Sequence, residues 1–329
     1  MLSGKDLIVA TKEFAKEDKL KSWFLSLSTV FILIALFAGT YWNFNIYGRI
    51  ICSILAGLVI VRLFVIYHDH QHGAILQKSK IADIIFICFG VFILAPPSIW
   101  KRSHDFHHKH NSKMPVSEVG AFPTITKEEF LSLSKVERFG YLASRHPITI
   151  LFGYLSIFFY SLTFYSFWNS PKKHIDCGIA ILIHFTLAIC ILWFLGIVTF
   201  ILSFFIPFFI ACGMGSYLFY IQHNFPGVTF SERKNWSYEY AALESSSYLV
   251  LNPVMSWFTA NIGYHHIHHI NARIPFYRLP EAMRSIPELQ KVKTTSFKIK
   301  DVVNCLSLKF WDSKTRQMVG LKELKKSVA

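Results

Sequence analysis

The chain has 329 residues, of which 53% are hydrophobic and only 16% are charged, and its formal net charge is +14. This composition excludes an ordinary soluble protein, because a soluble chain of this length would divide into domains with charged surfaces. It also disfavours a nucleic-acid-binding protein, since the lysines and arginines form no single stripe among aromatic residues. Basic loops beside membrane spans explain the charge better, and they are compatible with docking of an acidic redox partner.

Apolar runs close to the ~20 residues that cross a bilayer predict transmembrane helices. Residues 1–22 carry mixed charges, and no small-residue cleavage site follows the first apolar run, so they predict a cytoplasmic N-terminal helix before an uncleaved span. The polar residues 270–329 predict a cytoplasmic tail with short helices, such as 279–290. The four predicted spans are about 23–42, 47–67, 178–195 and 198–221.

Two further apolar stretches, 82–99 and 148–168, are predicted to be interfacial or re-entrant. If either crossed the bilayer once, the histidine clusters on its two sides would be separated by the membrane. The links 43–46 and 196–197 are short and uncharged, which places them outside, whereas segments with lysine or arginine belong inside. These inside segments are 1–22, 76–82, 101–113, 127–145, 172–174 and 230–236. The sequence thus predicts one all-α integral membrane domain over 1–329, with four transmembrane helices, interfacial or re-entrant helices and a cytoplasmic cap.

Histidine is concentrated in three short clusters on the predicted inner side. They are "YHDHQHG" at 67–73, "SHDFHHKHN" at 103–111 and "GYHHIHHINARIP" at 263–275, and His223 follows the last span directly. Spacings of three and four residues place imidazoles on one face of a helix, whereas neighbours at other spacings turn away at about 100° per residue. The histidines that we expect to converge are His68, His72, His104, His107, His108, His223, His265, His268 and His269.

This constellation predicts a metal centre. A single HxxxH pair is more often incidental, and the HExxH pattern of zinc proteases is absent, but three clusters on one side are hard to explain as core histidines. Eight or nine ligands suit two ions with open positions, because one tetrahedral zinc takes four. Imidazole binds Zn, Cu, Fe and Ni, so ligand type alone does not name the ion. Asp69 and Asp105 are candidates to accept imidazole protons and fix the tautomers, with helix capping or solvation as the equal alternative.

The clusters resemble the histidine boxes of the integral-membrane fatty acid desaturases. The corresponding patterns are HDxxHG at 68–73, HDxHH at 104–108 and HHxHH at 265–269. The flanking stretches "QHNFPG" at 222–227 and "NIGYHHIHHINARIPFYRL" at 261–279 are similar to the bacterial branch related to acyl-lipid and omega-6 (Δ12) enzymes. The resemblance covers most of the chain from about residue 60 to residue 290.

The resemblance implies a non-haem centre of two Fe ions that uses O₂ and two electrons to insert a double bond into a fatty acyl chain. It implies the nine histidines above as ligands and no catalytic side chain beyond them, while His70, His110 and His266 remain candidates for supporting roles. The chain has neither an HPGG haem-binding stretch nor a cysteine cluster. The electron donor is therefore expected to be a separate ferredoxin or cytochrome b5-like protein. The acyl carrier (lipid, CoA or acyl carrier protein) stays open, and a bacterial inner membrane is the expected location.

Two other classes compete with this interpretation. Carotenoid ketolases or hydroxylases and alkane hydroxylases share similar histidine spacings, and only the flanking stretches favour an acyl substrate. A metal transporter or receptor is disfavoured, because a transporter should hold its ionisable ligands near the bilayer midplane. Here only His184 lies deep inside a predicted span, and His146 and His174 lie in predicted loops.

Overall fold

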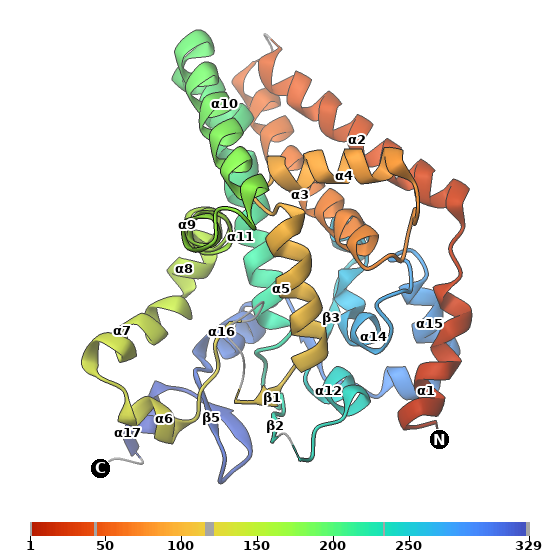
Figure 1. The fold of residues 1–329 in the computed structure, drawn as a ribbon, viewed down its shortest axis with the longest axis vertical. Coiled ribbons are helices and arrows are strands. Elements are labelled where there is room, and N and C mark those ends of the chain that lie inside the picture. The colour runs from red at the N-terminus through yellow and green to blue at the C-terminus, as the bar shows by residue number, and fades with distance from the viewer. Residues whose placement is uncertain (1, 43–44, 116–121, 233, 327–329) are drawn as a thin grey trace.

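The computed structural model describes residues 2–42, 45–115, 122–232 and 234–326, and it is mostly helical (Figure 1). The predicted link 43–46 falls partly outside these residues. Within the described chain, three segments are long and apolar enough to cross a membrane, and a bent helix pair would make a fourth. The three segments are α2 (Lys19–Tyr41), α3 (Ile46–Gln71) and the stretch Ile175–Ile221. The chain is therefore a membrane protein.

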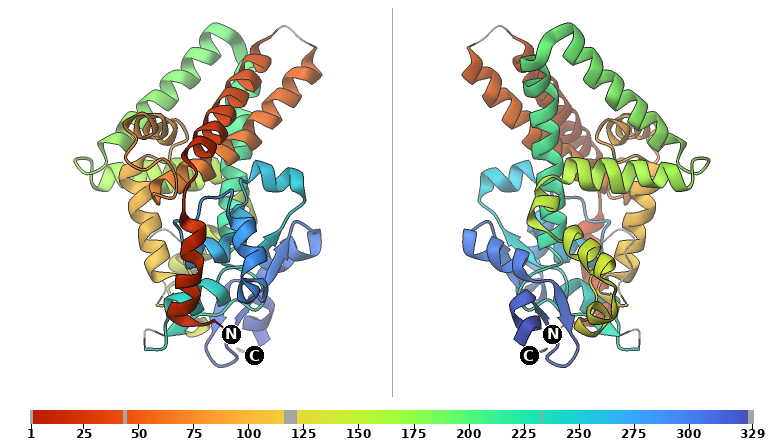
Figure 2. Two further views of the ribbon diagram at one scale, coloured as in Figure 1. Left: turned by 90° about the vertical axis from the view of Figure 1, so that its right-hand side faces the viewer. Right: turned by 90° about the vertical axis from the view of Figure 1, so that its left-hand side faces the viewer.

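The third segment is broken by a glycine. It comprises α10 (Ile175–Phe200), the π-helical turn η3 (Ile201–Phe205) and α11 (Ile206–Ile221). A straight helix of 47 residues would be about 70 Å long, more than twice the ~30 Å apolar core of a bilayer. Gly196 has a φ of 79° and a ψ of 169°, a conformation that only glycine adopts without a steric penalty. Figure 2 shows the chain reversing direction there, where the link 196–197 was predicted.

Neither of the two ambiguous stretches is among the three candidate spans. The first lies in α4 (Lys80–Phe92) and the start of α5 (Pro97–His110), and these two helices are bent by 92°. Proline cannot continue a preceding helix, which explains the break before Pro97. The second forms α8 (Pro147–Leu151), the π-helical segment η2 (Tyr154–Phe164) and α9 (Tyr165–Asn169), and Figure 2 shows it running crosswise to α11.

The N-terminal segment differs in detail from the single helix expected over 1–22. It contains α1 (Gly4–Ala10) and a 3-10 turn, η1 (Thr11–Ala15), and α2 then begins at Lys19. The boundary is set by Asp18, whose carboxylate accepts a hydrogen bond from the backbone nitrogen of Lys21 at 3.0 Å. Such a cap satisfies one of the free N–H groups in the first turn of a helix.

A cap of short elements covers one end of the long helices (Figures 1 and 2). Short helices were expected in the tail, and α15 and η5 occupy the stretch predicted at 279–290. The helices of the cap are α6 (Lys127–Ser132), α7 (Lys135–Ser144), α12 (Tyr238–Glu244), α13 (Pro253–Phe258), η4 (Ile262–Tyr264), α14 (His265–Ile270), α15 (Leu279–Ser285), η5 (Pro287–Gln290), α16 (Ile299–Ser307) and α17 (Leu321–Lys326).

In the part of the chain that the structure describes, three two-stranded sheets, which the sequence did not predict, join segments of the cap. The pairs β1 (Lys113–Met114) with β2 (Ser231–Glu232) and β3 (Tyr248–Val250) with β4 (Thr294–Ser296) are parallel, and β5 (Phe310–Asp312) with β6 (Gln317–Val319) is antiparallel. Parallel pairs join strands that are distant in sequence. The first two pairs therefore tie the chain after α5 and the C-terminal tail to the segment that follows α11.

The long helices position the histidine clusters by packing closely. Helix α3 packs against both α2 and α11. At Gly57 an added Cβ would lie 2.8 Å from Ile210 Cβ and 3.0 Å from Pro207 O, so this approach of α3 to α11 requires a glycine. Because the two helices end at the cap, their last residues deliver His68, His72 and His223 to the same region.

Candidate metal centre

The histidine clusters lie where the long helices meet the cap. His68 and His72 are at the end of α3, and His223 directly follows α11. The second cluster lies on α5, and the third cluster lies on the short helix α14. The structure brings together the eight histidines selected by spacing and His223, which was selected by its place after the last span, in two groups whose potential ligand atoms lie within 4.8 Å of one another. Group 1 contains His68, His72, His104, His108 and His268, and group 2 contains His107, His223, His265 and His269.

Group 1 combines residues from all three clusters. His104 Nε2 lies 2.8 Å from His68 Nε2 and 3.1 Å from His108 Nε2. His268 Nε2 lies 3.1 Å from His108 Nε2. His72 Nε2 is buried without a hydrogen-bond partner among the described residues. The imidazole nitrogens of this group therefore converge.

Group 2 is built around His223. Its Nε2 lies 3.0 Å from His107 Nε2, 2.9 Å from His265 Nε2 and 3.2 Å from His269 Nε2. Its Nδ1 donates to the carbonyl oxygen of Ser245 at 3.0 Å, which leaves Nε2 as a bare lone pair. This backbone acceptor is a part of the site that sequence reasoning did not identify.

The contacts in group 2 fit a bound cation better than a hydrogen-bond network. His223, His265 and His269 form a triangle of Nε2 atoms, because His265 Nε2 and His269 Nε2 are also 3.1 Å apart. A neutral imidazole carries one N–H proton, and that of His223 is used on Nδ1. Only His265 and His269 can therefore carry a proton on Nε2. Two protons cannot bridge three nitrogen–nitrogen contacts, so in at least one contact two lone pairs face each other without a proton between them. Metal–nitrogen bonds of about 2.0–2.1 Å place neighbouring ligand nitrogens about 3 Å apart, which matches the spacing in both groups.

Burial keeps these imidazoles neutral. Desolvation, reinforced by the neighbouring histidines, lowers the pKa of His265, His268 and His269 well below the usual value. Desolvation lowers the pKa of His223 to about 4. A neutral histidine has a lone pair to offer, so the metal does not have to displace a proton at neutral pH.

The two aspartates next to the first two clusters have different surroundings. Asp69 is buried, its Oδ1 lies 3.2 Å from His68 Nδ1, and its Oδ2 accepts from the backbone nitrogen of Phe276 at 2.7 Å. This contact orients His68 Nε2 towards group 1. Asp105 instead accepts from Lys101 Nζ at 2.8 Å, on a side chain that is 38% exposed. Asp105 therefore forms a surface ion pair. This corresponds to the alternative in which its carboxylate is solvated and does not accept an imidazole proton.

The remaining histidines of the clusters turn away from both groups. His70 Nε2 lies 2.9 Å from Asp83 Oδ1. His110 Nδ1 donates to Phe106 O at 2.9 Å, and His266 Nε2 donates to Leu289 O at 3.0 Å. None of these three histidines belongs to either group.

A third possible ligand set lies at the start of α10, away from the two groups. His174, Asp176 and Cys177 have ligand atoms within 4.8 Å of one another. Hydrogen bonds explain this arrangement, because Asp176 accepts from both the backbone nitrogen and the hydroxyl of Ser98, at 3.0 and 2.5 Å. Helix α5 has no side-chain cap of its own at Pro96. Asp176 thus caps the helix that carries the second cluster.

A large cavity leads to the two groups. Its volume is about 1040 Å³, and its walls include His68, His104 and His265 together with many apolar side chains. Trp100, which sequence reasoning missed, lines this cavity and stacks on His104 with ring centroids 5.1 Å apart. Its position four residues before His104 is the only sequence signal for this contact.

Comparisons with known proteins identify relatives along most of the chain. A family model described as fatty acid desaturase matches residues 44–297. The chain is 29% identical over 274 residues to a fatty acid desaturase of Bacillus subtilis (strain 168), which covers 83% of this chain and 77% of the relative. It is 23% identical over 291 residues to an sn-1 oleoyl-lipid 12-desaturase of Anabaena variabilis, with coverage of 86% and 81%. It is 24% identical over 288 residues to a chloroplastic omega-6 fatty acid desaturase of Glycine max, with coverage of 84% and 65%.

Proposed function

Since this chain belongs to the fatty acid desaturase family and is therefore an oxidoreductase of fatty acyl chains, we propose that its two histidine groups each hold one iron. The proposed ligands are His68, His72, His104, His108 and His268 in group 1, and His107, His223, His265 and His269 in group 2. The observation that carries the proposal is the convergence of these nine imidazoles beside one large cavity, which His68, His104 and His265 help to line.

Two irons and O₂ would supply the oxidising power that removes two hydrogens from neighbouring methylenes. The side chains cannot supply it, because an unactivated C–H bond offers no acidic proton for general acid–base chemistry. The protein's part is to bind, orient and exclude water. Asp69 holds the ring of His68, and the backbone of Ser245 holds the ring of His223.

The cavity supports a fatty acyl chain as the substrate. Its volume of about 1040 Å³ reaches the upper end of the usual range for small-molecule pockets. Phe64, Phe158 and Phe219 contribute to its wall, which suits a hydrocarbon chain that must be kept dry. The Anabaena variabilis relative acts on an oleoyl-lipid by name, so a lipid-linked acyl chain is the first substrate to test.

We place the protein as a single domain with four membrane spans and with its metal centre on the cytoplasmic side of a bacterial inner membrane. The break at Gly196 supports two spans in place of one, and the basic inner segments support this orientation. The electron donor is a separate acidic protein, of the ferredoxin or cytochrome b5 kind. If that protein docks through opposite charge, turnover with it should fall as ionic strength rises.

The decisive experiment is expression in a host that lacks polyunsaturated lipids, followed by gas chromatography of the fatty acids. New double bonds with the wild-type chain, and none with His268→Ala, would support the proposal. Hydroxylated or ketolated products would instead assign the chain to a related oxygenase. Full activity of purified protein after iron removal would refute the di-iron centre.

A further inference from the structure

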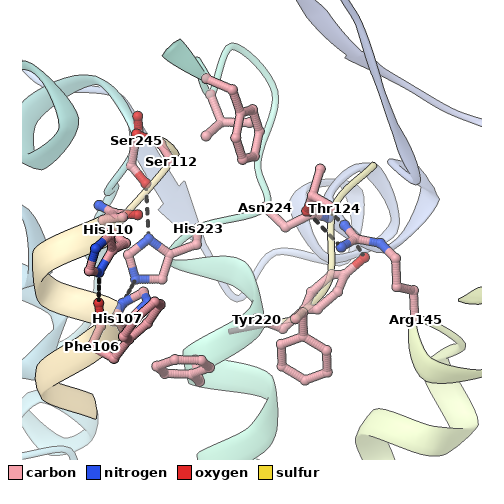
Figure 3. Close-up of a pocket in the computed structure, with 15 residues that line it drawn as sticks. Phe106, His107, His110, Ser112, Thr124, Arg145, Tyr220, His223, Asn224 and Ser245 are labelled. Atoms are coloured by element: carbon pink, nitrogen blue, oxygen red, sulfur yellow. Dashed lines mark hydrogen bonds between the residues drawn. The ribbon is translucent and has the colours of Figure 1, made fainter. Parts of the chain in front are cut away.

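Arg145 is a buried cation beside the metal-ligand region. It follows α7 and is 0% exposed. Its Nη1 donates to Pro123 O and Thr124 Oγ1, at 2.5 and 3.0 Å, and its Nη2 donates to Asn224 Oδ1 at 2.5 Å and to Tyr220 OH at 3.4 Å (Figure 3). All four acceptors are neutral. A buried charge without a carboxylate partner costs free energy unless hydrogen bonds compensate it, so these four bonds are what keeps Arg145 in place.

The bonds of Arg145 hold the turn that carries His223. Asn224 uses its other amide atom, Nδ2, to donate to Cys305 O at 2.6 Å. Tyr220 donates through its hydroxyl to Leu308 O at 3.2 Å. The end of α11 and the turn after it are therefore held between the guanidinium on one side and the C-terminal segment 305–308 on the other.

Arg145 does not itself belong to group 2. A cavity of about 40 Å³ is lined by Arg145 and Asn224 and also by His107 and His223. Figure 3 shows Arg145, Thr124 and Asn224 gathered on one side of it and His107 and His223 on the other. Arg145 therefore acts on the histidines only indirectly, through Tyr220 at the end of α11 and, more closely, through Asn224, which is next to His223 in the chain.

The position of His223 matters more than that of any other residue in group 2. Its Nε2 lies within 3.2 Å of the Nε2 atoms of the three other members. A site of this kind has to be held to about 0.5 Å. The neighbour of His223 in the chain is Asn224, so a displacement of Asn224 is transmitted directly to the ligand.

We propose that Arg145 is a positioning residue for group 2, which fixes His223 by hydrogen-bonding Asn224. The inference rests on the proposed di-metal centre and adds to it a residue that contacts neither ion. Lysine cannot replace Arg145, because one ammonium group cannot reproduce the planar fork that binds Thr124 and Asn224 together.

The test compares three variants of the full chain, purified in detergent and loaded with ⁵⁷Fe. Arg145→Lys keeps the charge but loses the fork, and Asn224→Ala keeps Arg145 but loses the link. Arg62→Lys is the matched control, because Arg62 is also buried and bonds to neutral oxygens, Thr29 Oγ1 and Trp257 O, but in the membrane part of α3. Iron per chain is measured by elemental analysis, and the environments of the two irons are measured by Mössbauer spectroscopy.

We expect two irons in wild type and in Arg62→Lys, and about one in Arg145→Lys and Asn224→Ala, with loss of one of the two Mössbauer signals. Two irons with unchanged spectra in Asn224→Ala would overturn the inference, and this holds even if Arg145→Lys fails to fold. Equal iron loss in Arg62→Lys would also overturn it, since the effect would then be one of general stability. A wild-type chain that never binds two irons would instead refute the proposed function.

Discussion

Replacing Asp69 with asparagine should weaken metal binding in group 1 without unfolding the protein. The carboxylate of Asp69 accepts from two groups at once, His68 Nδ1 at 3.2 Å and the backbone nitrogen of Phe276 at 2.7 Å. Asparagine has the same shape but only one acceptor oxygen. Its amide group would face either Phe276 N–H or His68 Nδ1, and in the second case His68 would carry its proton on Nε2, where it cannot bind a metal.

The size of the effect follows from the bond that is lost. Removing a hydrogen-bond partner of a metal-bound histidine lowers metal affinity by roughly 10–100-fold, which corresponds to about 1.4–2.7 kcal/mol. A hydrogen bond to a charged group is worth about 1.5–3 kcal/mol, so the two estimates agree. The loss should be confined to group 1, because Asp69 contacts His68 and not the members of group 2.

Competition with a chelator measures this affinity, by following the iron that remains on the chain as chelator is added. Asp105→Asn is the matched control, because Asp105 also follows a ligand histidine but pairs with Lys101 at the surface. We expect Asp69→Asn to release its iron at roughly 10–100-fold lower chelator concentration and Asp105→Asn to behave as wild type. If both variants released iron at the same chelator concentration, whether equal to that of wild type or lower, the reasoning would be refuted.

Three further predictions concern the cavity, the pH response and helix capping. Trp100→Ala should lower turnover by roughly 10–100-fold and give products with a wider range of double-bond positions, because Trp100 lines the cavity. Gas chromatography that shows unchanged products would contradict this. The metal-free chain should lose thermal stability as the pH falls from 6.5 towards 4. Burial lowers the pKa of His223 from 6.5 to about 4, so in this range the unfolded chain binds a proton that the folded chain does not. A melting temperature that does not change over this pH range would contradict the prediction. Asp176→Ala should lower the free energy of unfolding by about 0.5–2 kcal/mol, since Ser98 N loses its acceptor, whereas a stability equal to wild type would show that water replaces the cap.

Local patterns in the sequence were sufficient to predict the helical membrane class and the set of histidines. Both depend on near neighbours along the chain: apolar runs need enough residues to cross a bilayer, and spacings of three and four residues share a helix face. The same local rules predicted that the chain turns at Gly196. They missed the small sheets of the cap, because each strand has only two or three residues and pairs with a distant segment or across a short turn.

Only the tertiary packing determined how the nine histidines divide between the two groups and which polar residues hydrogen-bond to them. His107 and His108 are adjacent in sequence but belong to different groups. Successive residues on α5 point about 100° apart, so His107 contacts His223 after α11, whereas His108 contacts His72 at the end of α3. Asp69 and Asp105 both follow a ligand histidine, yet only Asp69 is buried against one. Such differences depend on contacts between segments far apart in the chain, and no local pattern encodes those contacts.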